Sequence, residues 1–182
     1  TAEWMSHRKI LDIGTGAGIP GLIIKFLCPE THVTLLDSSS KKISFLREVI
    51  EVLAIKNVDL LHGRAEHFAH ENIHREEYDL VVSRGVAKLP ELAELTLPFA
   101  SVGGTVISVK GSNVSTEIEQ SELAAAILGS APALSRVVER PGGLSIDTLV
   151  YWLKIKPTPP IYPRRNGVPH SNPLSRDRNL AE

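Results

Sequence analysis

The sequence predicts an α/β fold built on a doubly wound, mostly parallel sheet that ends in an antiparallel hairpin. Short apolar runs alternate with longer amphipathic segments along most of the chain. This pattern favours parallel βαβ units with right-handed crossovers. A cluster of glycines directly follows the first apolar run, and two apolar runs near the end of the chain have no helical pattern between them. The first feature predicts a strand-turn-helix unit, and the second predicts a hairpin.

The first half of the chain divides into two strand-helix units. We expect a buried strand at 9–13, a tight turn at the glycines and a helix over 20–27. Apolar residues occur all round this helix, which predicts that it is buried. A second buried strand is expected at 33–36, followed by three candidate helix caps, Ser38, Ser39 and Ser40. The next helix should bury one apolar face, formed by Ile43, Leu46, Val49, Ile50 and Leu53.

The second half continues the alternation and then changes pattern. Further strands are expected at 58–61, 78–83 and 105–110, with one helix that reaches Leu95 and another over 115–128. The hairpin strands should cover 134–139 and 149–155, joined by a loop with Pro141, Gly142 and Gly143. Residues 157–173 hold six of the twelve prolines, which predicts an extended segment rather than a packed element.

Composition indicates one globular domain in a reducing compartment, and we expect the cytoplasm. The 182 residues are 42% hydrophobic and 23% charged, and no apolar run approaches the ~20 residues that span a bilayer. Cys28 is the single cysteine, so no disulfide forms within the chain, and its apolar neighbours predict a small packed residue. The net charge of −1 hides an asymmetry, because residues 154–182 carry six basic and two acidic side chains.

The glycine loop at 14–21 is the strongest candidate for a ligand site. Glycines allow sharp turns and close approach of a ligand to the backbone, and the carboxyl end of a parallel strand is where such folds bind ligands. The spacing of Gly16, Gly18 and Gly21 also satisfies the dinucleotide fingerprint, and a turn without any ligand is a further alternative. Asp12 and the additional Gly14 favour the cationic S-adenosylmethionine, because a pyrophosphate prefers less negative charge.

Asp37 is the second candidate ligand residue. It ends the second expected strand, where its carboxylate can accept hydrogen bonds from both hydroxyls of a ribose. Its alternative role is to cap the helix that begins near Ser40. The position of the glycine loop favours the ribose.

Several motifs occur in the order found in one family. They are the segment 12–21, Leu36-Asp37-Ser38 followed by Lys41, His62-Gly63-Arg64-Ala65-Glu66, Ser83-Arg84, Lys110-Gly111 and Tyr162-Pro163-Arg164. From about Ile10 to Leu174 the chain thus resembles the RsmG (GidB) family, the enzymes that methylate N7 of a guanine in 16S ribosomal RNA. The resemblance implies a Rossmann-like class I methyltransferase fold that uses S-adenosylmethionine, and a target in the 530 loop (position 527).

The resemblance also assigns roles to individual residues. Gly14 and Ile19 would line the methionine and backbone side of the cofactor, Ala65 and Glu66 would flank the adenine, and Arg84 would take the remaining cofactor-site position. With the residues argued above, the expected cofactor set is Asp12, Gly14, Gly16, Gly18, Ile19, Asp37, Ser38, Ala65, Glu66 and Arg84. We expect a methyltransferase domain over 1–156 and a tail over 157–182. Family members usually carry an N-terminal helical region, for which this chain has only residues 1–8.

Methyl transfer to N7 of guanine needs no general base, because N7 already carries an available lone pair. We therefore expect no catalytic acid or base, with Arg84 the one candidate, and catalysis by alignment. Arg84 could instead form an ion pair with Asp12 or Glu66. The target should be an unpaired or distorted loop of 16S ribosomal RNA or the small subunit. Tyr162, Arg164 and Arg165 are the expected RNA contacts, unless the tail is only a strap over the domain.

Other classes of function remain open at this point. A nicotinamide-dependent oxidoreductase would need a hydride-transfer acid, for which the sequence offers no candidate. A non-catalytic RNA-binding or regulatory module would bind RNA without transferring a methyl group. We expect no membrane partner and no metal, because the spacing of the histidines matches no zinc pattern; these are His62, His67, His70 and His74.

Overall fold

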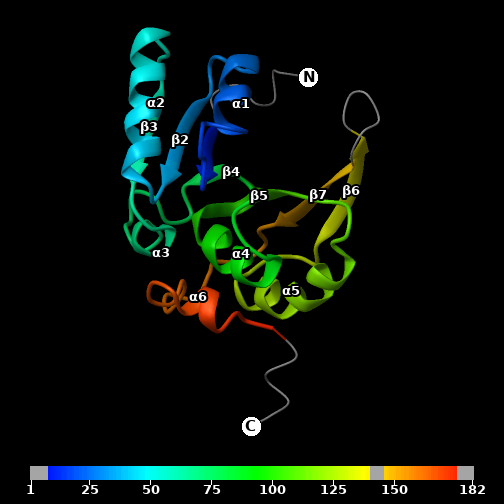
Figure 1. Cartoon of the computed structure of the whole chain (residues 1–182). Helices are drawn as coiled ribbons and strands as arrows, with labels where there is room; N and C mark the ends of the chain where they lie inside the picture. The colour runs from blue at the N-terminus through cyan, green and yellow to red at the C-terminus, as the bar shows by residue number, and fades with distance from the viewer. Residues whose placement is uncertain (1–7, 140–145, 176–182) are drawn as a thin grey trace.

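The computed structural model describes residues 8–139 and 146–175, and these form one seven-stranded sheet with helices on both faces (Figure 1). The strands are β1 (Lys9–Ile13), β2 (His32–Asp37), β3 (Val58–His62), β4 (Tyr78–Arg84), β5 (Ala100–Lys110), β6 (Leu134–Glu139) and β7 (Ile146–Leu153). The helices are α1 (Gly21–Leu27), α2 (Ser40–Val52), α3 (Ala65–Phe68), α4 (Leu89–Thr96), the 3-10 turn η2 (Leu97–Phe99), α5 (Ser115–Ile127) and α6 (Val168–Ser171).

The strand order β3-β2-β1-β4-β5-β7-β6 confirms the doubly wound sheet with a terminal hairpin. The pairs from β3 to β5 are parallel, whereas β7 lies antiparallel between β5 and β6. Chain order reverses on either side of β1, because β2 lies on one side and β4 on the other. Open α/β sheets bind ligands at the carboxyl ends of strands at such a switch point. The hairpin loop with Pro141, Gly142 and Gly143 lies outside the described residues.

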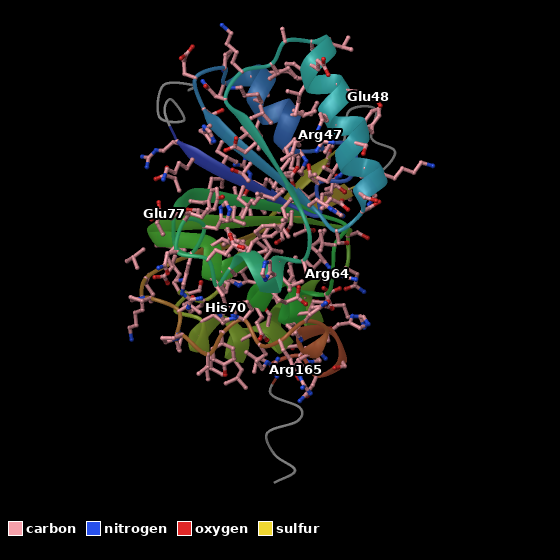
Figure 2. All side chains as sticks on the ribbon, turned by 90° about the vertical axis from the view of Figure 1, so that its left-hand side faces the viewer. Arg47, Glu48, Arg64, His70, Glu77 and Arg165 are labelled. Atoms are coloured by element: carbon pink, nitrogen blue, oxygen red, sulfur yellow. The ribbon has the colours of Figure 1, made fainter. Side chains whose placement is uncertain are left out.

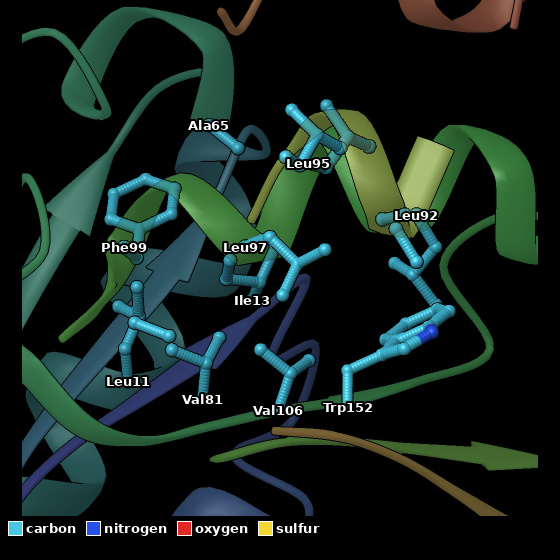
Figure 3. Close-up of a cluster of buried hydrophobic side chains, with 14 of the residues drawn as sticks. Leu11, Ile13, Ala65, Val81, Leu92, Leu95, Leu97, Phe99, Val106 and Trp152 are labelled. Atoms are coloured by element: carbon cyan, nitrogen blue, oxygen red, sulfur yellow. The ribbon is translucent and has the colours of Figure 1, made fainter. Parts of the chain in front are cut away.

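Two apolar clusters fix the helices to the two faces of the sheet. One cluster joins α1 and α2 to the upper face in Figure 1 through side chains such as Leu22, Ile43 and Leu46. The larger cluster joins α3, α4 and α5 to the other face, where Leu11 and Val81 of the central strands meet Phe99 and Trp152 (Figure 3). The carboxyl ends of β1, β2 and β4 are therefore held between two helical layers.

Helix α1 is less buried than its sequence predicts. Leu22 is buried, but Ile23, Phe26 and Leu27 are exposed by 47%, 53% and 71%. The helix packs against β1 and β2, while the side that carries Ile23, Phe26 and Leu27 stays largely exposed. Apolar residues all round a helix allow it to be buried on every side. Whether it is buried depends on how many other helices and strands pack against it. Cys28, at the end of this helix, is partly buried in the same cluster, as predicted.

The proline-rich tail is a packed strap, which corrects the prediction of an extended segment without packing. We call residues 157–175 the strap. Arg75 holds it by donating to the carbonyl oxygens of Tyr162 (2.8 Å), Thr158 (2.9 Å) and Pro159 (3.2 Å). Prolines lack an N–H but keep their carbonyl groups, so side-chain donors can dock such a segment without a regular sheet or helix ladder. None of the described helices is long and apolar enough to cross a bilayer.

Replacing Leu92 by Ala should lower the free energy of unfolding by about 2–5 kcal/mol. Leu92 belongs to α4, and its side chain packs in the large apolar cluster with only 2% exposed (Figure 3). The matched change Leu27→Ala, at a side chain 71% exposed, should stay within about 0.5 kcal/mol of the parent. Urea unfolding measures both. Equal losses for the two variants would contradict the assignment of the core.

Candidate functional site

The glycine loop turns directly after β1 and needs glycine at its first position. Gly14 has φ +66°, and a Cβ there would come within 2.6 Å of Cγ2 of Val86. Gly16 has φ +62°, and a Cβ there would face open space, with its nearest atom 4.0 Å away. The Thr15 amide donates to the carbonyl of Leu36 (3.1 Å), which ties the loop to β2. The loop thus leaves an accessible hollow beside its backbone.

Asp12 lies beneath this loop and is fully buried. Its Oδ2 accepts hydrogen bonds from Oγ1 of Thr15 (2.6 Å) and from the Gly21 amide (2.8 Å). Its Oδ1 has no partner among the described residues. Burial raises the pKa of Asp12 to about 6, against the opposing effect of these hydrogen bonds. The carboxylate therefore braces the turn, and direct contact with a ligand stays a prediction.

Asp37 connects the loop to the start of α2. Its Oδ2 accepts a hydrogen bond from the Gly16 amide (2.9 Å), and its Oδ1 accepts one from the Ser39 amide (2.9 Å). Nζ of Lys42 approaches Oδ2 at 3.4 Å. None of the serines expected to cap α2 makes a side-chain cap, so Asp37 performs part of that task. Both roles considered for Asp37 remain compatible with this geometry.

A pocket of about 270 Å³ opens at the carboxyl ends of β1, β2 and β4. Five of the predicted cofactor residues line it: Gly14, Asp37, Ser38, Ala65 and Glu66. The other five do not, namely Asp12, Gly16, Gly18, Ile19 and Arg84. The other lining residues were not in the expected set: Ile13, Leu36, Lys42, Gly63, Arg64, Gly85, Val86 and Leu95. Gly85 carried a usable signal, since it follows an apolar strand just as Gly14 does.

Arg84 is the last residue of β4 and is exposed. It has no hydrogen bond or ion pair with any residue that the structure describes, so the ion pair with Asp12 or Glu66 considered from the sequence does not form there. Its positive charge nevertheless acts against the rise in the pKa of Asp12. The guanidinium is thus available beside the switch point, although it does not line the pocket.

A second hollow of about 740 Å³ adjoins the first, because Gly85 and Val86 line both. Its wall also includes Lys88, Glu91 and Lys110, together with His170 of the strap. Residues of the β4–α4 loop, the start of α4, the end of β5, α5 and the strap therefore meet around one space. None of the residues that line this second hollow was expected as a ligand residue from the sequence.

Lys110 holds the residues that directly follow Gly85 and Val86, the two residues that line both hollows. Its Nζ donates to the carbonyl of Ala87 (2.9 Å) and pairs with Oε2 of Glu117 (2.8 Å). The same Oε2 accepts a hydrogen bond from the Leu89 amide (3.0 Å) at the start of α4. The end of β5 and the start of α5 thus hold residues 87–89, directly after Gly85 and Val86, in place.

The three predicted RNA contacts lie in different surroundings. Tyr162 packs against the large apolar cluster, and Arg164 is bound to the buried carboxylate of Glu94 (2.6 Å). Arg165 is exposed, and Figure 2 shows it with Arg64 in the half of the molecule away from Arg47 and Glu48 of α2. Their contact with RNA stays a prediction, and Arg165 is the best placed of the three.

Two of the four histidines considered as metal ligands form hydrogen bonds within the fold. Nε2 of His70 lies 2.8 Å from the carbonyl of Pro163, and Nδ1 of His74 lies 2.8 Å from the hydroxyl of Tyr78. Among the residues that the structure describes, no three His, Cys, Asp or Glu side chains gather as metal ligands would.

Comparison with known proteins gives the family and the fold. The family model for rRNA small subunit methyltransferase G (GidB) matches residues 1–140. Ribosomal RNA small subunit methyltransferase G of Lactobacillus delbrueckii subsp. bulgaricus is 42% identical over 166 residues, covering 91% of this chain and 70% of that protein. The protein of the same name from Moorella thermoacetica is 42% identical, with 91% and 69% covered.

Solved structures share the architecture at lower identity. A predicted O-methyltransferase from Agrobacterium tumefaciens has a TM-score of 0.66 at 19% identity, covering 82% of this chain and 75% of that one. Precorrin-6y C5,15-methyltransferase from Geobacter metallireducens has a TM-score of 0.60 at 16% identity, with 82% and 81% covered. These likenesses confirm the predicted class I methyltransferase fold.

The burial of Asp12 predicts a stability that depends on pH. Its pKa is about 6 in the folded chain, above the usual 3.8, so the folded state binds the proton more tightly than the unfolded state. The free energy of unfolding should therefore fall as pH rises from about 4 to 6, by roughly 3 kcal/mol. Asp12→Asn should remove this fall. Urea unfolding across that range, with the exposed Asp59→Asn as the control, would refute the assignment if parent and Asp12→Asn curves run parallel.

Proposed function

Because this chain belongs to the rRNA small subunit methyltransferase G family, we propose that it methylates N7 of a guanine in the 530 loop of 16S ribosomal RNA. S-adenosylmethionine is the cofactor, in keeping with the family and the fold. The observation that carries the proposal is the pair of hollows that share Gly85 and Val86 at the switch point of the sheet. One offers room for the methyl donor and the other for the nucleotide that receives the methyl group.

The residues of the first pocket suit an adenosine with a cationic tail. Asp37 presents a nearly buried carboxylate to the pocket. A carboxylate has about four acceptor positions, of which the Gly16 and Ser39 amides take two. The long contact with Lys42 is the one that a ribose hydroxyl can displace. Ala65 and Glu66 lie in the wall assigned to the adenine, and the open space at Gly16 leaves the loop accessible.

When bound, S-adenosylmethionine supplies a methyl group that is activated by its attachment to a sulfonium. N7 of guanine attacks without losing a proton, so the chain needs no general base. Its residues instead have to hold the two partners in line and exclude water, which is the contribution expected from positioning. Lys110 and Glu117 suit this task, because they fix residues 87–89, which directly follow the Gly85 and Val86 shared by the two hollows.

Exposed basic residues around the hollows support an RNA substrate. Arg64 lines the first pocket, and Lys88 lines the second. Arg84 is exposed directly before the shared Gly85, and Arg165 is exposed in the strap. N7 faces the deep major groove in A-form RNA, where side chains cannot reach it, so a loop nucleotide is the suitable target. The basic residues would then neutralise phosphates of the flanking nucleotides.

The division into a catalytic domain at 1–156 and a tail at 157–182 is also a proposal. The family assignment gives no support to the nicotinamide-dependent alternative. A non-catalytic RNA-binding module differs in one measurable respect, since it would bind RNA without transferring methyl groups.

The proposal is tested by incubating the chain with labelled S-adenosylmethionine and small ribosomal subunits from a strain that lacks the enzyme. We expect one N7-methylguanosine in the 530 loop. Label at another nucleotide would reject the assigned target, and RNA binding without label would favour the non-catalytic module.

Arg84→Lys should lower cofactor affinity or the methyl-transfer rate about tenfold, because lysine offers a point charge where arginine donates several hydrogen bonds in a plane. The control is Arg47→Lys on α2, on an exposed helix face away from the strap (Figure 2). Parental affinity and rate in both Arg84→Lys and Arg84→Ala would show that Arg84 has no functional role.

Asp37→Asn should weaken S-adenosylmethionine binding by about tenfold or more, because an amide keeps the size of the side chain but loses a charged acceptor. Calorimetry measures the affinity, with Asp79→Asn as the control, because Asp79 lies near the amino end of β4, away from the carboxyl ends that form the pocket. Unchanged affinity in a folded Asp37→Asn protein would remove Asp37 from the ligand site.

A further inference from the structure

The backbone amide, Nε and Nη2 of Arg164 are occupied by contacts within the protein. Its backbone amide and its Nε donate to Oε1 of Glu94 at 2.7 and 2.9 Å, and its Nη2 donates to Oε2 at 2.6 Å. The same Nη2 also donates to the carbonyl of Asn172 (2.8 Å). This one side chain thus binds α4 and closes a loop from 164 to 172.

Glu94 makes this anchor costly to release. Its side chain is 0% exposed, and among the residues that the structure describes its carboxylate is bound by Arg164 alone. Withdrawing the guanidinium toward a phosphate would leave a buried carboxylate without a compensating charge. The pair therefore favours a fixed loop over a mobile, RNA-seeking arginine.

The loop that Arg164 closes reaches both hollows. The Gly167 amide donates to Oε1 of Glu66 (3.1 Å), a residue of the first pocket. His170 and Ser171, at the end of α6, line the second hollow together with Pro173. Figure 1 shows α6 directly beneath α4, and the two helices are in contact. The loop thus extends from the cofactor pocket to the space assigned to the nucleotide.

We propose that residues 164–172 form a wall of the target-nucleotide hollow, and that Arg164 is a positioning residue that sets this wall through Glu94 and Asn172 rather than a phosphate ligand. The inference rests on the proposed function for the identity of the nucleotide. It reassigns Arg164 from electrostatic attraction to the shape of the site. Misplacing a wall by about 1 Å is enough to cost large factors in productive binding.

The test uses the double variant Arg164→Met and Glu94→Gln, which removes the ion pair without leaving a buried charge. We expect the KM for the small subunit to rise about tenfold or more, while the Kd for S-adenosylmethionine stays within about threefold of the parent. The dependence of RNA affinity on salt should keep its slope, because no phosphate contact is lost. Amides of 167–172 should lose protection from hydrogen exchange.

Two arginine variants serve as comparisons. Arg165→Met, at the exposed neighbour of Arg164, should reduce the salt slope by about one, as a lost phosphate contact does. Arg47→Met on α2 should leave KM, slope and exchange unchanged (Figure 2). Arg164→Lys keeps a charge for Glu94 but cannot also hold Asn172 in the same geometry. This variant should therefore have nearly the folding stability of the parent, while its KM for the small subunit stays raised.

Two results would overturn the inference. A salt slope reduced by about one in the double variant would show that Arg164 contacts phosphate. A parental KM together with lost exchange protection would show that the loop is no wall of the substrate site. If this double variant does not fold, Arg164→Gln combined with Glu94→Gln carries the same two readouts, because neither amide is charged and the two can hydrogen-bond to each other. Failure of the proposed function is distinct, because the parent chain itself would then place no methyl group on guanine.

Discussion

The carboxylate of Asp12, buried beneath the glycine loop, is the constraint on which the rest of the site depends. It accepts hydrogen bonds from Thr15 within the turn and from the Gly21 amide at the start of α1, so one side chain links the end of β1 to the helix that follows. This turn also places the Gly16 amide where it donates a hydrogen bond to Asp37 at the end of β2. Burial raises the pKa of Asp12, because keeping its charged carboxylate away from water costs free energy.

The order of the strands explains why the two hollows lie side by side. β1 pairs with β2 on one side and with β4 on the other, so the loops that follow these strands leave in opposite directions and the space between them stays open. Gly14 packs directly against Val86, because a Cβ at position 14 would come within 2.6 Å of Cγ2 of Val86. Cofactor and nucleotide can thus approach from two sides of one narrow segment, Gly85 and Val86.

The sequence was most informative where local chemistry alone decides the structure. A glycine cluster after an apolar run and an aspartate at a strand end predicted the ligand loop and Asp37, and both line or brace the pocket. The exposed side of α1 and the packing of the strap could not be predicted, because they depend on which distant elements are present to cover them. Arg164 illustrates the limit: it looked like an RNA contact among prolines, and only the fold brings it to Glu94, 70 positions away in sequence.

The most direct test of this account is a crystal structure of the chain with S-adenosylhomocysteine, the product form of the cofactor. We predict that both ribose hydroxyls lie within hydrogen-bond distance of the Asp37 carboxylate, with the adenine beside Ala65 and Glu66 and the sulfur directed toward Gly85 and Val86. A nucleoside bound at any other place, or one that leaves the Asp37 carboxylate untouched, would contradict the assignment of the pocket.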